Sequence, residues 1–212
     1  MPAEPPSAAT RVRRHPERGR YEREVVDAIL DAALVSHVGF AHERPFVIPM
    51  IHARDGDTLY LHGSPGSRLL RTLEHGVDVC VTATVIDGIV LARSLFHHSL
   101  NYRSAVVLGR ARLVSEDEEK LRALHAVAEH VVPGRAGDTR EPSPKELLAT
   151  KVLAVAIDEA SAKVRTGPPI DDEDDLGLPF WAGVVPLRTA AGEPDPLDPS
   201  LPIPDYVRRL SG

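Results

Sequence analysis

The sequence is poor in several residue types, and each scarcity excludes a class of protein. Cys80 is the single cysteine, so no disulfide can form within one chain, which is usual in a reducing cytoplasm. No apolar run reaches the about 18 residues of a membrane-spanning helix, and the first residues do not resemble a secretory signal. The net charge of −6 argues against a nucleic-acid binder, which usually carries a basic domain. We therefore expect a cytoplasmic protein with no membrane and no nucleic-acid partner.

Aromatic residues make up only 4% of the 212 residues, whereas the apolar fraction as a whole is 42%. A chain of this length can bury a sizeable core, and here the core must consist mainly of valine, leucine, isoleucine and alanine.

Periodicity predicts mostly strands. Apolar runs flank Asp-Gly pairs at Asp55-Gly56 and Asp87-Gly88, and such a pair between apolar runs is a strong hairpin signal. Helical spacing marks residues 21–34 and 116–132, the second opened by Ser115 and Glu118 as a capping box. The pattern predicts strands at 35–41, 46–54, 58–61, 77–85, 88–93, 102–115, 151–159 and 161–166, and helices at 21–34, 69–74, 116–132 and 143–150. Many short strands with a few helices indicate an antiparallel barrel with helices packed outside.

Composition divides the chain into three parts. Residues 1–20 form a basic N-terminal arm that we expect to be flexible, residues 21–166 hold the barrel, and residues 167–212 are a proline-rich C-terminal extension. Within the extension, residues 179–186 are an apolar island that contains Phe180 and Trp181. Because exposed apolar patches are unfavourable, we expect this island to dock on the barrel or on a partner subunit.

A small-residue loop follows the first hairpin. It runs from Gly63 and Ser64 to Ser67 and Arg68, where a helix is predicted to begin. Free backbone N–H groups at a helix start, together with an arginine, are typical of a phosphate site. The same residues also make ordinary turns and an ordinary helix N-cap, so the loop alone leaves both interpretations open.

A second stretch, SLFHHSLNYRSAVVLG, begins at Ser94 and completes a series of motifs that follow one another along the chain. Together with PFVIPM, DGDTLYLHGSPGSRLL and GVDVCVT, it resembles the pyridoxamine 5′-phosphate oxidase-like flavin-binding split barrels, in particular the branch of flavin-nucleotide-binding proteins and nitroimidazole-resistance reductases. The resemblance spans residues 11–187. It implies a mainly β (α+β) fold, a split antiparallel β-barrel of the FMN-binding type with peripheral helices. It also implies a homodimer with the cofactor at the subunit interface.

The resemblance also implies a cofactor and its residues. FMN is the expected cofactor, with deazaflavin and haem as alternatives. Four regions match the family's cofactor positions: the strand along the flavin ring, the next strand, the phosphate loop and the polar start of a later strand. The candidate residues in these regions are Val47, Ile48, Pro49, Met50, Tyr60, His62, Gly63, Ser64, Ser67, Arg68, Asn101, Tyr102 and Arg103. Leu69 replaces the second consecutive basic residue of the oxidase, so Arg71 or an N-terminal arginine would have to assist Arg68.

Ten histidines raise the question of a metal. His97 and His98 would point apart on a strand, and His125 and His130 are five residues apart, so the spacing does not support a structural metal site. Haem remains a rival to flavin, because some split-barrel relatives bind it through histidine. The candidate axial ligands are His52, His62 and His98. No residue set marks side-chain catalysis, and the catalytic residues stay unassigned.

Three functional hypotheses follow. The first is an FMN-dependent oxidoreductase that carries electrons from a nicotinamide donor to a small acceptor, such as a nitroaromatic or a quinone. The second is a binding protein without turnover that holds a flavin, a deazaflavin or a haem. The third is a barrel without a cofactor that serves as an interaction module. Oxidation of pyridoxamine phosphate itself is not expected, because residues 188–212 lack that enzyme's Arg-x-x-x-His type of substrate region.

Overall fold

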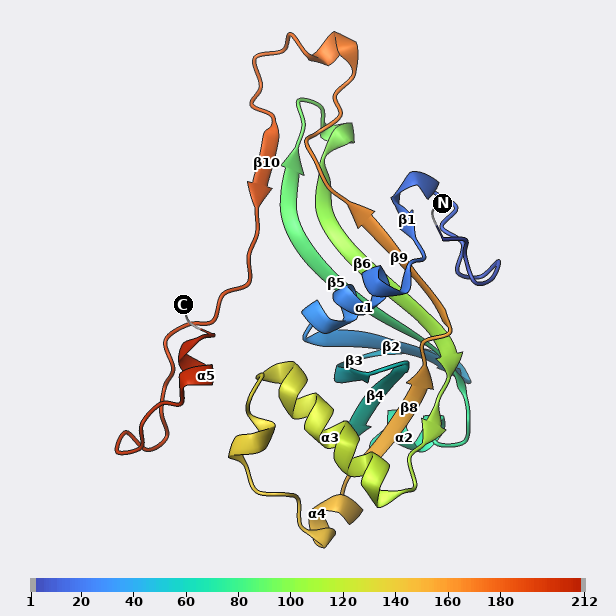
Figure 1. Cartoon of the computed structure of the whole chain (residues 1–212). Helices are drawn as coiled ribbons and strands as arrows, with labels where there is room; N and C mark the ends of the chain where they lie inside the picture. Colours follow the sequence, from blue (N-terminus) through green and yellow to red (C-terminus); the bar gives the residue numbers. More distant parts are fainter. Residues whose placement is uncertain (1–2, 211–212) are drawn as a thin grey trace.

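The structure, a computed structural model, describes residues 3–210, and within them the strands form one ten-stranded antiparallel sheet. The strand order is β1-β9-β6-β5-β2-β3-β4-β8-β7, and β10 pairs with β5. The sheet is strongly curved, with helices at its periphery (Figure 1). The strands are β1 (Gly19–Arg20), β2 (Val35–His42), β3 (Arg44–Asp55), β4 (Thr58–Gly63), β5 (Asp78–Leu91), β6 (Ser99–Arg110), β7 (Arg112–Leu113), β8 (Lys151–Ala156), β9 (Glu159–Arg165) and β10 (Gly183–Pro186). The helices are α1 (Arg23–Ala32), α2 (Arg68–Leu73), α3 (Asp117–Val131), α4 (Pro144–Leu148) and α5 (Asp205–Arg208).

Alternation along the strands separates an inner face from an outer face. On β4, Leu59 and Leu61 are fully buried and share the inner face with their register partners on β8, Val155 and Leu153. Helix α1 adds Leu30, which is equally inaccessible. Burial of each such side chain contributes about 1.5–3 kcal/mol, so this inner face is the main source of stability. The predicted mainly β fold with peripheral helices is confirmed.

Helix α3 covers one end of the outer face. Tyr60 of β4 and Ala154 of β8 are register partners that pack with Ala123 of α3 in a smaller, second apolar cluster. The rest of the outer face, over β2 and β3, carries exposed apolar side chains, of which Val47 is 66% exposed. Helix α3 therefore shields one end of the outer face, whereas the other end is open to solvent.

The turn predicted at Asp87-Gly88 is wrong. Strand β5 runs without interruption through this pair, and only a bulge between Ile86 and Gly88 marks it. A side chain at Gly88 would come within 3.1 Å of Val184 and Val185 of β10. The glycine is thus required by the close approach of β10 and not by a reversal of the chain.

Two further local predictions are corrected. Helix α3 begins after Glu116 without any side-chain cap, so the capping box of Ser115 and Glu118 is wrong, whereas α4 has a complete box between Ser143 and Glu146. The predicted strand 102–115 ends early, because β6 stops at Arg110 and the short β7 follows.

Strands β5 and β6 extend beyond the body as an arm (Figure 1). Strand β2 pairs with residues 79–83 of β5, whereas residues 88–91 of β5 pair with β10. Near the far end, the Arg93 guanidinium lies 2.6 Å from the Asp171 carboxylate, and the Arg93 backbone N–H donates to the same group at 2.9 Å. The Asp171 side chain is only 2% exposed. These contacts fix the start of the C-terminal extension to the arm.

The apolar island is ordered, but its large side chains are not buried. Residues 183–186 form β10, whose backbone pairs with β5. Phe180 and Trp181 nevertheless remain exposed, Trp181 by 66%. Within one subunit the two rings are therefore not buried against the barrel, and docking of the island on a partner subunit stays a prediction.

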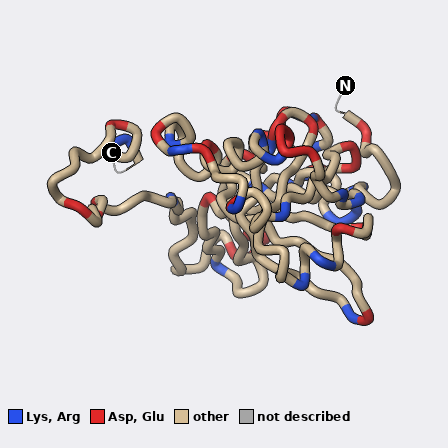
Figure 2. Tube along the Cα trace, turned by 90° about the horizontal axis from the view of Figure 1, so that it is seen from below, with Lys and Arg blue, Asp and Glu red and all other residues tan. Residues whose placement is uncertain are grey.

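Both ends of the chain run along the outside. Before β1, the backbone N–H of Val12 donates to the Tyr21 hydroxyl at 2.9 Å, and β1 itself pairs with β9. The C-terminal extension projects from the body in Figures 1 and 2 and returns to the loop after α3, where the Tyr206 hydroxyl donates to Asp138 at 2.6 Å.

Figure 2 shows acidic and basic residues interleaved along most of the trace. Among the residues the structure describes, no helix has the length and apolar composition needed to cross a membrane.

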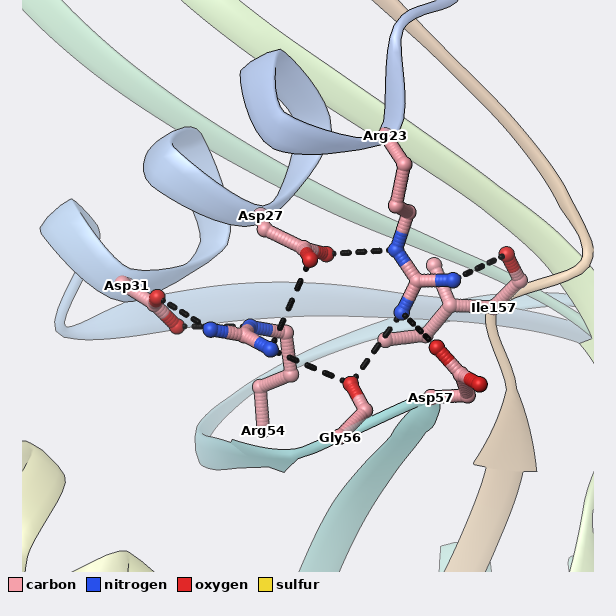
Figure 3. Close-up of polar contacts among 7 residues, drawn as sticks. All are labelled: Arg23, Asp27, Asp31, Arg54, Gly56, Asp57 and Ile157. Atoms are coloured by element: carbon pink, nitrogen blue, oxygen red, sulfur yellow. Dashed lines mark hydrogen bonds and ion pairs between the residues drawn. The ribbon is translucent and has the colours of Figure 1, made fainter.

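An ion-pair network joins α1 to the β3–β4 turn (Figure 3). Arg54 of β3 binds both carboxylate oxygens of Asp31, at 2.9 and 2.6 Å, and also donates to the Gly56 carbonyl at 3.1 Å. Arg23 of α1 binds Asp27 at 2.7 Å and Asp57 at 3.0 Å. The network holds the helix that fills the barrel against the strand that leads into the candidate site.

Replacing Arg54 with alanine should lower the free energy of unfolding by about 1 kcal/mol, because Arg54 loses a two-pronged ion pair with the half-exposed Asp31 and its hydrogen bond to the Gly56 carbonyl. For a chain of this size that corresponds to a drop in melting temperature of about 2–4 °C per kcal/mol. Arg122→Ala is the matched control, since its pair with Glu118 is exposed and worth only about 0.3–0.5 kcal/mol. Equal melting temperatures for the two variants, measured by calorimetry, would contradict this role of Arg54.

Candidate functional site

The uncovered part of the outer face forms an apolar platform, which consists of Val35 of β2 and Val47, Pro49 and Ile51 of β3. All four side chains are exposed. The register pairs Val35 with Ile51, and residues two apart on a strand share a face, so the four point the same way. A flat apolar surface of this kind suits the face of a planar ring system.

The strand that carries the platform was predicted as the ring-lining strand, and its residues divide by face. Val47 and Pro49 belong to the platform, whereas Ile48 and Met50 are half-buried and pack against the inner core. Side-chain contact with a ligand on the outer face is therefore restricted to Val47 and Pro49. Ile48 and Met50 could contribute only backbone groups there.

A cavity of about 840 Å³ lies beside α2, at the end of the predicted phosphate loop. It is lined by His42, Gly66, Arg68, Arg71, Thr72, Glu74, His75 and Val77. The Ser67 backbone N–H donates to the Ser64 carbonyl at 2.9 Å, which closes the turn before α2. No hydrogen bond from the Ser67 hydroxyl occurs within the described residues, and α2 has no side-chain cap. The hydroxyl is thus available to a ligand.

Arg68 and Arg71 place two positive charges in this cavity. Neither forms an ion pair within residues 3–210, whereas the neighbouring Glu74 is bound by Lys151, which holds the pKa of Glu74 below its usual value. The Arg68 guanidinium lies 5.3 Å from the centre of the Phe46 ring, which in turn stacks on Phe40 at 5.5 Å. Contact with an aromatic face orients the guanidinium without neutralising it. The cavity therefore offers one oriented guanidinium, that of Arg68, and a second positive charge on Arg71 that Glu74, already bound by Lys151, offsets only in part.

His62 has an unused imidazole. It follows Tyr60 on the same face of β4, and the register of β3 with β4, which begins at His52 and Leu61, would set it level with Ile51 of the platform if continued by one residue. Its Nδ1 atom is buried without a partner, no hydrogen bond to its ring occurs in the described structure, and burial lowers its pKa. A neutral imidazole with free nitrogens beside an apolar surface is a suitable metal ligand.

The other two haem candidates are engaged. His52 is fully buried, and its Nε2 lies 2.9 Å from the Leu30 carbonyl at the end of α1. His98 accepts a hydrogen bond at Nδ1 from the backbone N–H of Ala92 at 3.0 Å. His52 in particular is inaccessible to a ligand, so its candidacy is wrong. Among the described residues, no group of three or more histidine, cysteine or acidic side chains could hold a metal ion.

His52 gives the fold a pH dependence. Its ring lies 4.8 Å from that of His130, and burial, followed by the effect of His130, lowers the pKa of His52 below 6.5 although the Leu30 carbonyl opposes this. The unfolded chain therefore takes up a proton near pH 6.5 that the folded chain resists. Stability from neutral His52 is complete above pH 6.5 and is lost as the pH falls below it.

Unfolding by urea should show this loss, with a free energy that falls between pH 6.5 and lower pH. The variant His52→Gln, which keeps a donor for the Leu30 carbonyl, should have a flatter profile. The exposed His125→Gln is the control and should keep the slope of the wild type. Parallel profiles for wild type and His52→Gln would contradict the assignment.

The remaining predicted site residues lie elsewhere or are already bound. Tyr60 is buried under α3, and its hydroxyl donates to Glu119 at 3.0 Å. Arg103 forms a two-pronged pair with Asp87 at 2.9 and 2.8 Å, which lowers the pKa of Asp87. Asn101 is buried and donates to the Gly167 carbonyl at 3.1 Å. Asn101, Tyr102 and Arg103 pair with residues 85–88 of β5, beyond the part of β5 that pairs with β2, so within one subunit they join neither the platform nor the loop.

Sequence reasoning missed Phe46, which orients Arg68, and His42, which lines the cavity. Phe46 was assigned only to the hairpin, although the Phe-Val-Ile-Pro-Met order sets it one position before the platform. Strand alternation could have shown that Phe46 lies on the face opposite to Val47. Phe46 points inward, where its ring contacts Arg68 at the start of α2. His42 lies before the β2–β3 turn, and only the strand pairing brings it to the loop of residues 63–68.

Comparison with known proteins supplies the family context for this geometry. A family model described as pyridoxamine 5′-phosphate oxidase matches residues 22–164. The structure of the flavocytochrome Anf3 from Azotobacter vinelandii is 43% identical, covers 99% of this chain and 100% of its own, and superposes with a TM-score of 0.89. An FAD and haem binding protein from Mycobacterium smegmatis is 37% identical, covers 92% of this chain and 98% of its own, and gives a TM-score of 0.87.

A more distant structure is similar over part of the chain. A putative 5-nitroimidazole antibiotic resistance protein from Bacteroides thetaiotaomicron is 26% identical over 69% of this chain and 86% of its own, with a TM-score of 0.57. A search of curated proteins gives no match.

Proposed function

The chain belongs to the pyridoxamine 5′-phosphate oxidase family, and we propose that it is a redox protein that binds both a flavin and a haem. The observation that carries this proposal is the similarity to a flavocytochrome along 99% of the chain, extension included. A second relative of nearly equal similarity is named for FAD and haem binding. The hypothesis of a flavin or haem binding protein thus has better support than the hypothesis of an FMN-dependent reductase.

FAD is the flavin we propose, in place of the FMN expected from the sequence. The support is the name of the second relative and the size of the cavity beside α2. Arg68 and Arg71 would hold the phosphate groups, since both unpaired guanidinium groups line the cavity. The free Ser67 hydroxyl, at the N-cap of α2 between the lining residues Gly66 and Arg68, would assist them. Val47 and Pro49 would carry the ring system on the platform. Deazaflavin would use the same phosphate contacts, and its distinct mass separates it from FAD.

Haem would be held through His62. The residues fit the group, because an unpartnered imidazole nitrogen adjoins exposed apolar side chains such as Ile51. A haem supplies one-electron chemistry at its iron, and a flavin can exchange electrons singly or in pairs. The protein's own contribution is to orient the two groups and to keep His62 neutral, as its lowered pKa favours.

The platform also supports the proposed homodimer. Exposed apolar side chains on one continuous sheet face are unfavourable in a monomer, and they mark interaction sites. A second copy of the same face would cover Val35, Val47 and Ile51 by a two-fold axis, the commonest symmetry of oligomers. The cofactor would then lie at the interface, and Asn101, Tyr102 and Arg103 could reach it only from the partner. We place this assembly in the cytoplasm.

An anaerobic titration of the purified protein with NADH or NADPH tests the redox function. We expect the flavin absorbance to bleach and the haem bands to shift within the same titration, and a small oxidised acceptor such as a quinone or nitroaromatic should reverse both changes. A haem spectrum that stays oxidised after full reduction of the flavin would contradict electron transfer between the two groups.

A further inference from the structure

The end of the arm carries an unusual set of exposed side chains, here called the arm tip: Leu95, Phe96, Ile170, Phe180 and Trp181. Leu95 is 91% and Phe96 is 87% exposed, although both lie in a short turn of 3-10 helix whose Ser94 side chain accepts from the Phe96 backbone N–H. Exposure here is therefore a property of an ordered turn. A set of exposed apolar rings on an ordered segment marks an interaction surface.

Negative charge adjoins these rings. Asp172 is paired with His97 at 3.1 Å, but Glu173, Asp174 and Asp175 form no ion pair within residues 3–210. A partner for this surface should thus offer positive charge and side chains that can lie on aromatic faces. Arginine satisfies both requirements.

The chain itself contains such a segment. Arg11, Arg13 and Arg14 are exposed and make no ion pair or hydrogen bond in the described part of the chain. Figure 1 shows their segment beside β1 and β9, away from the end of the arm, so one subunit does not bring the two together. The arm is also long: residues 84–91 of β5, which lie beyond the part that pairs with β2, span about 26 Å at about 3.3 Å per residue.

We infer that the arm tip of one subunit docks on the Arg11–Arg14 segment of a second copy, and the reverse contact follows from the two-fold axis. The inference rests on the proposed homodimer and adds to it an interface outside the platform. The acidic residues would face the arginines, and Phe96 and Trp181 would stack on their guanidinium groups. Both the exposed rings and the two unpaired charge clusters would then be accounted for by one contact.

A charge swap tests the contact. Sedimentation equilibrium should show dimer dissociation constants raised about 10- to 100-fold in Arg11→Glu/Arg13→Glu/Arg14→Glu and in Glu173→Lys/Asp174→Lys/Asp175→Lys, since like charges then face each other. The protein with all six changes should recover most of the wild-type affinity. Lys145→Glu on α4 is the control for charge reversal and should be neutral. Unchanged dissociation constants in both triple variants would overturn the inference while leaving the dimer intact.

Cross-linking supplies a second measurement that does not depend on affinity. One protein would carry Cys80→Ser with Arg13→Cys and the other Cys80→Ser with Asp174→Cys, and a short bismaleimide should join the two chains only in the mixture. Two other outcomes would overturn the inference: a monomeric wild type, which would also refute the homodimer, or an arm tip that binds phosphatidylcholine vesicles while Phe96→Ser/Trp181→Ser dimerises normally. Retention of flavin and haem in any of these cases would leave the redox function standing.

Discussion

Replacing Arg68 with alanine should weaken flavin binding about 10- to 100-fold. A charge-assisted hydrogen bond contributes about 1.5–3 kcal/mol, and each 1.4 kcal/mol corresponds to about a tenfold change in affinity. Arg68 has no carboxylate partner within the described residues and is oriented by the Phe46 ring, so its charge is available in full to a phosphate. Titration of apoprotein with FAD, followed by quenching of flavin fluorescence, measures the effect.

Two comparisons make the result specific. Arg71→Ala should have a smaller effect of the same sign, because Arg71 lines the same cavity but is not oriented by an aromatic ring. Arg122→Ala, on the exposed side of α3, should bind FAD as the wild type does. If a folded Arg68→Ala protein retained wild-type FAD affinity, the phosphate site would have to lie elsewhere.

Replacing His62 with alanine should abolish haem retention and leave the flavin in place. Loss of an axial ligand removes the bond that fixes the iron, and even the loss of a residue that only supports a ligand costs about 10- to 100-fold in affinity. The measurement is the ratio of the Soret absorbance to the flavin absorbance in protein purified from haem-replete cells. Added imidazole should restore a Soret band in the variant, because it can enter the space left by the side chain.

The two rejected or engaged histidines serve as controls for this variant. His52→Gln should keep its haem, since His52 is buried against the Leu30 carbonyl. His98→Ala should also keep it. A Soret band that persists in His62→Ala and disappears in His98→Ala would transfer the ligand role to the arm.

The sequence predicted the parts of the site that depend on local pattern. The hairpin through Asp55-Gly56, the loop before Arg68 and the start of α2 all follow from turn chemistry and apolar alternation, and the structure has them in those positions. The same alternation divides Val47 to Met50 into two sets on opposite faces of the strand. Which set faces outward follows only from the structure, which shows where the core lies.

What the sequence could not predict depends on long-range pairing. Asp87-Gly88 has the composition of a turn, yet β10, nearly a hundred residues later, requires the glycine for close approach. The sequence gives no sign that Arg103 is bound, because its partner Asp87 comes beside it only through the pairing of β5 with β6. The burial of His52 similarly depends on where the end of α1 lies. In each case the residue's environment depends on a segment that is distant in the sequence, so the local pattern could not predict it.

The central claim, that this chain holds both a flavin and a haem, is tested most directly by identifying what the purified protein contains. Absorbance of the protein as isolated, followed by denaturation and mass spectrometry of the released small molecules, gives both identity and amount. We predict FAD and haem in equal amounts, one of each per chain, with flavin bands and a Soret band in the same spectrum. A protein that contains only FMN or a deazaflavin, or that stays colourless after FAD and haem are added, would contradict the account.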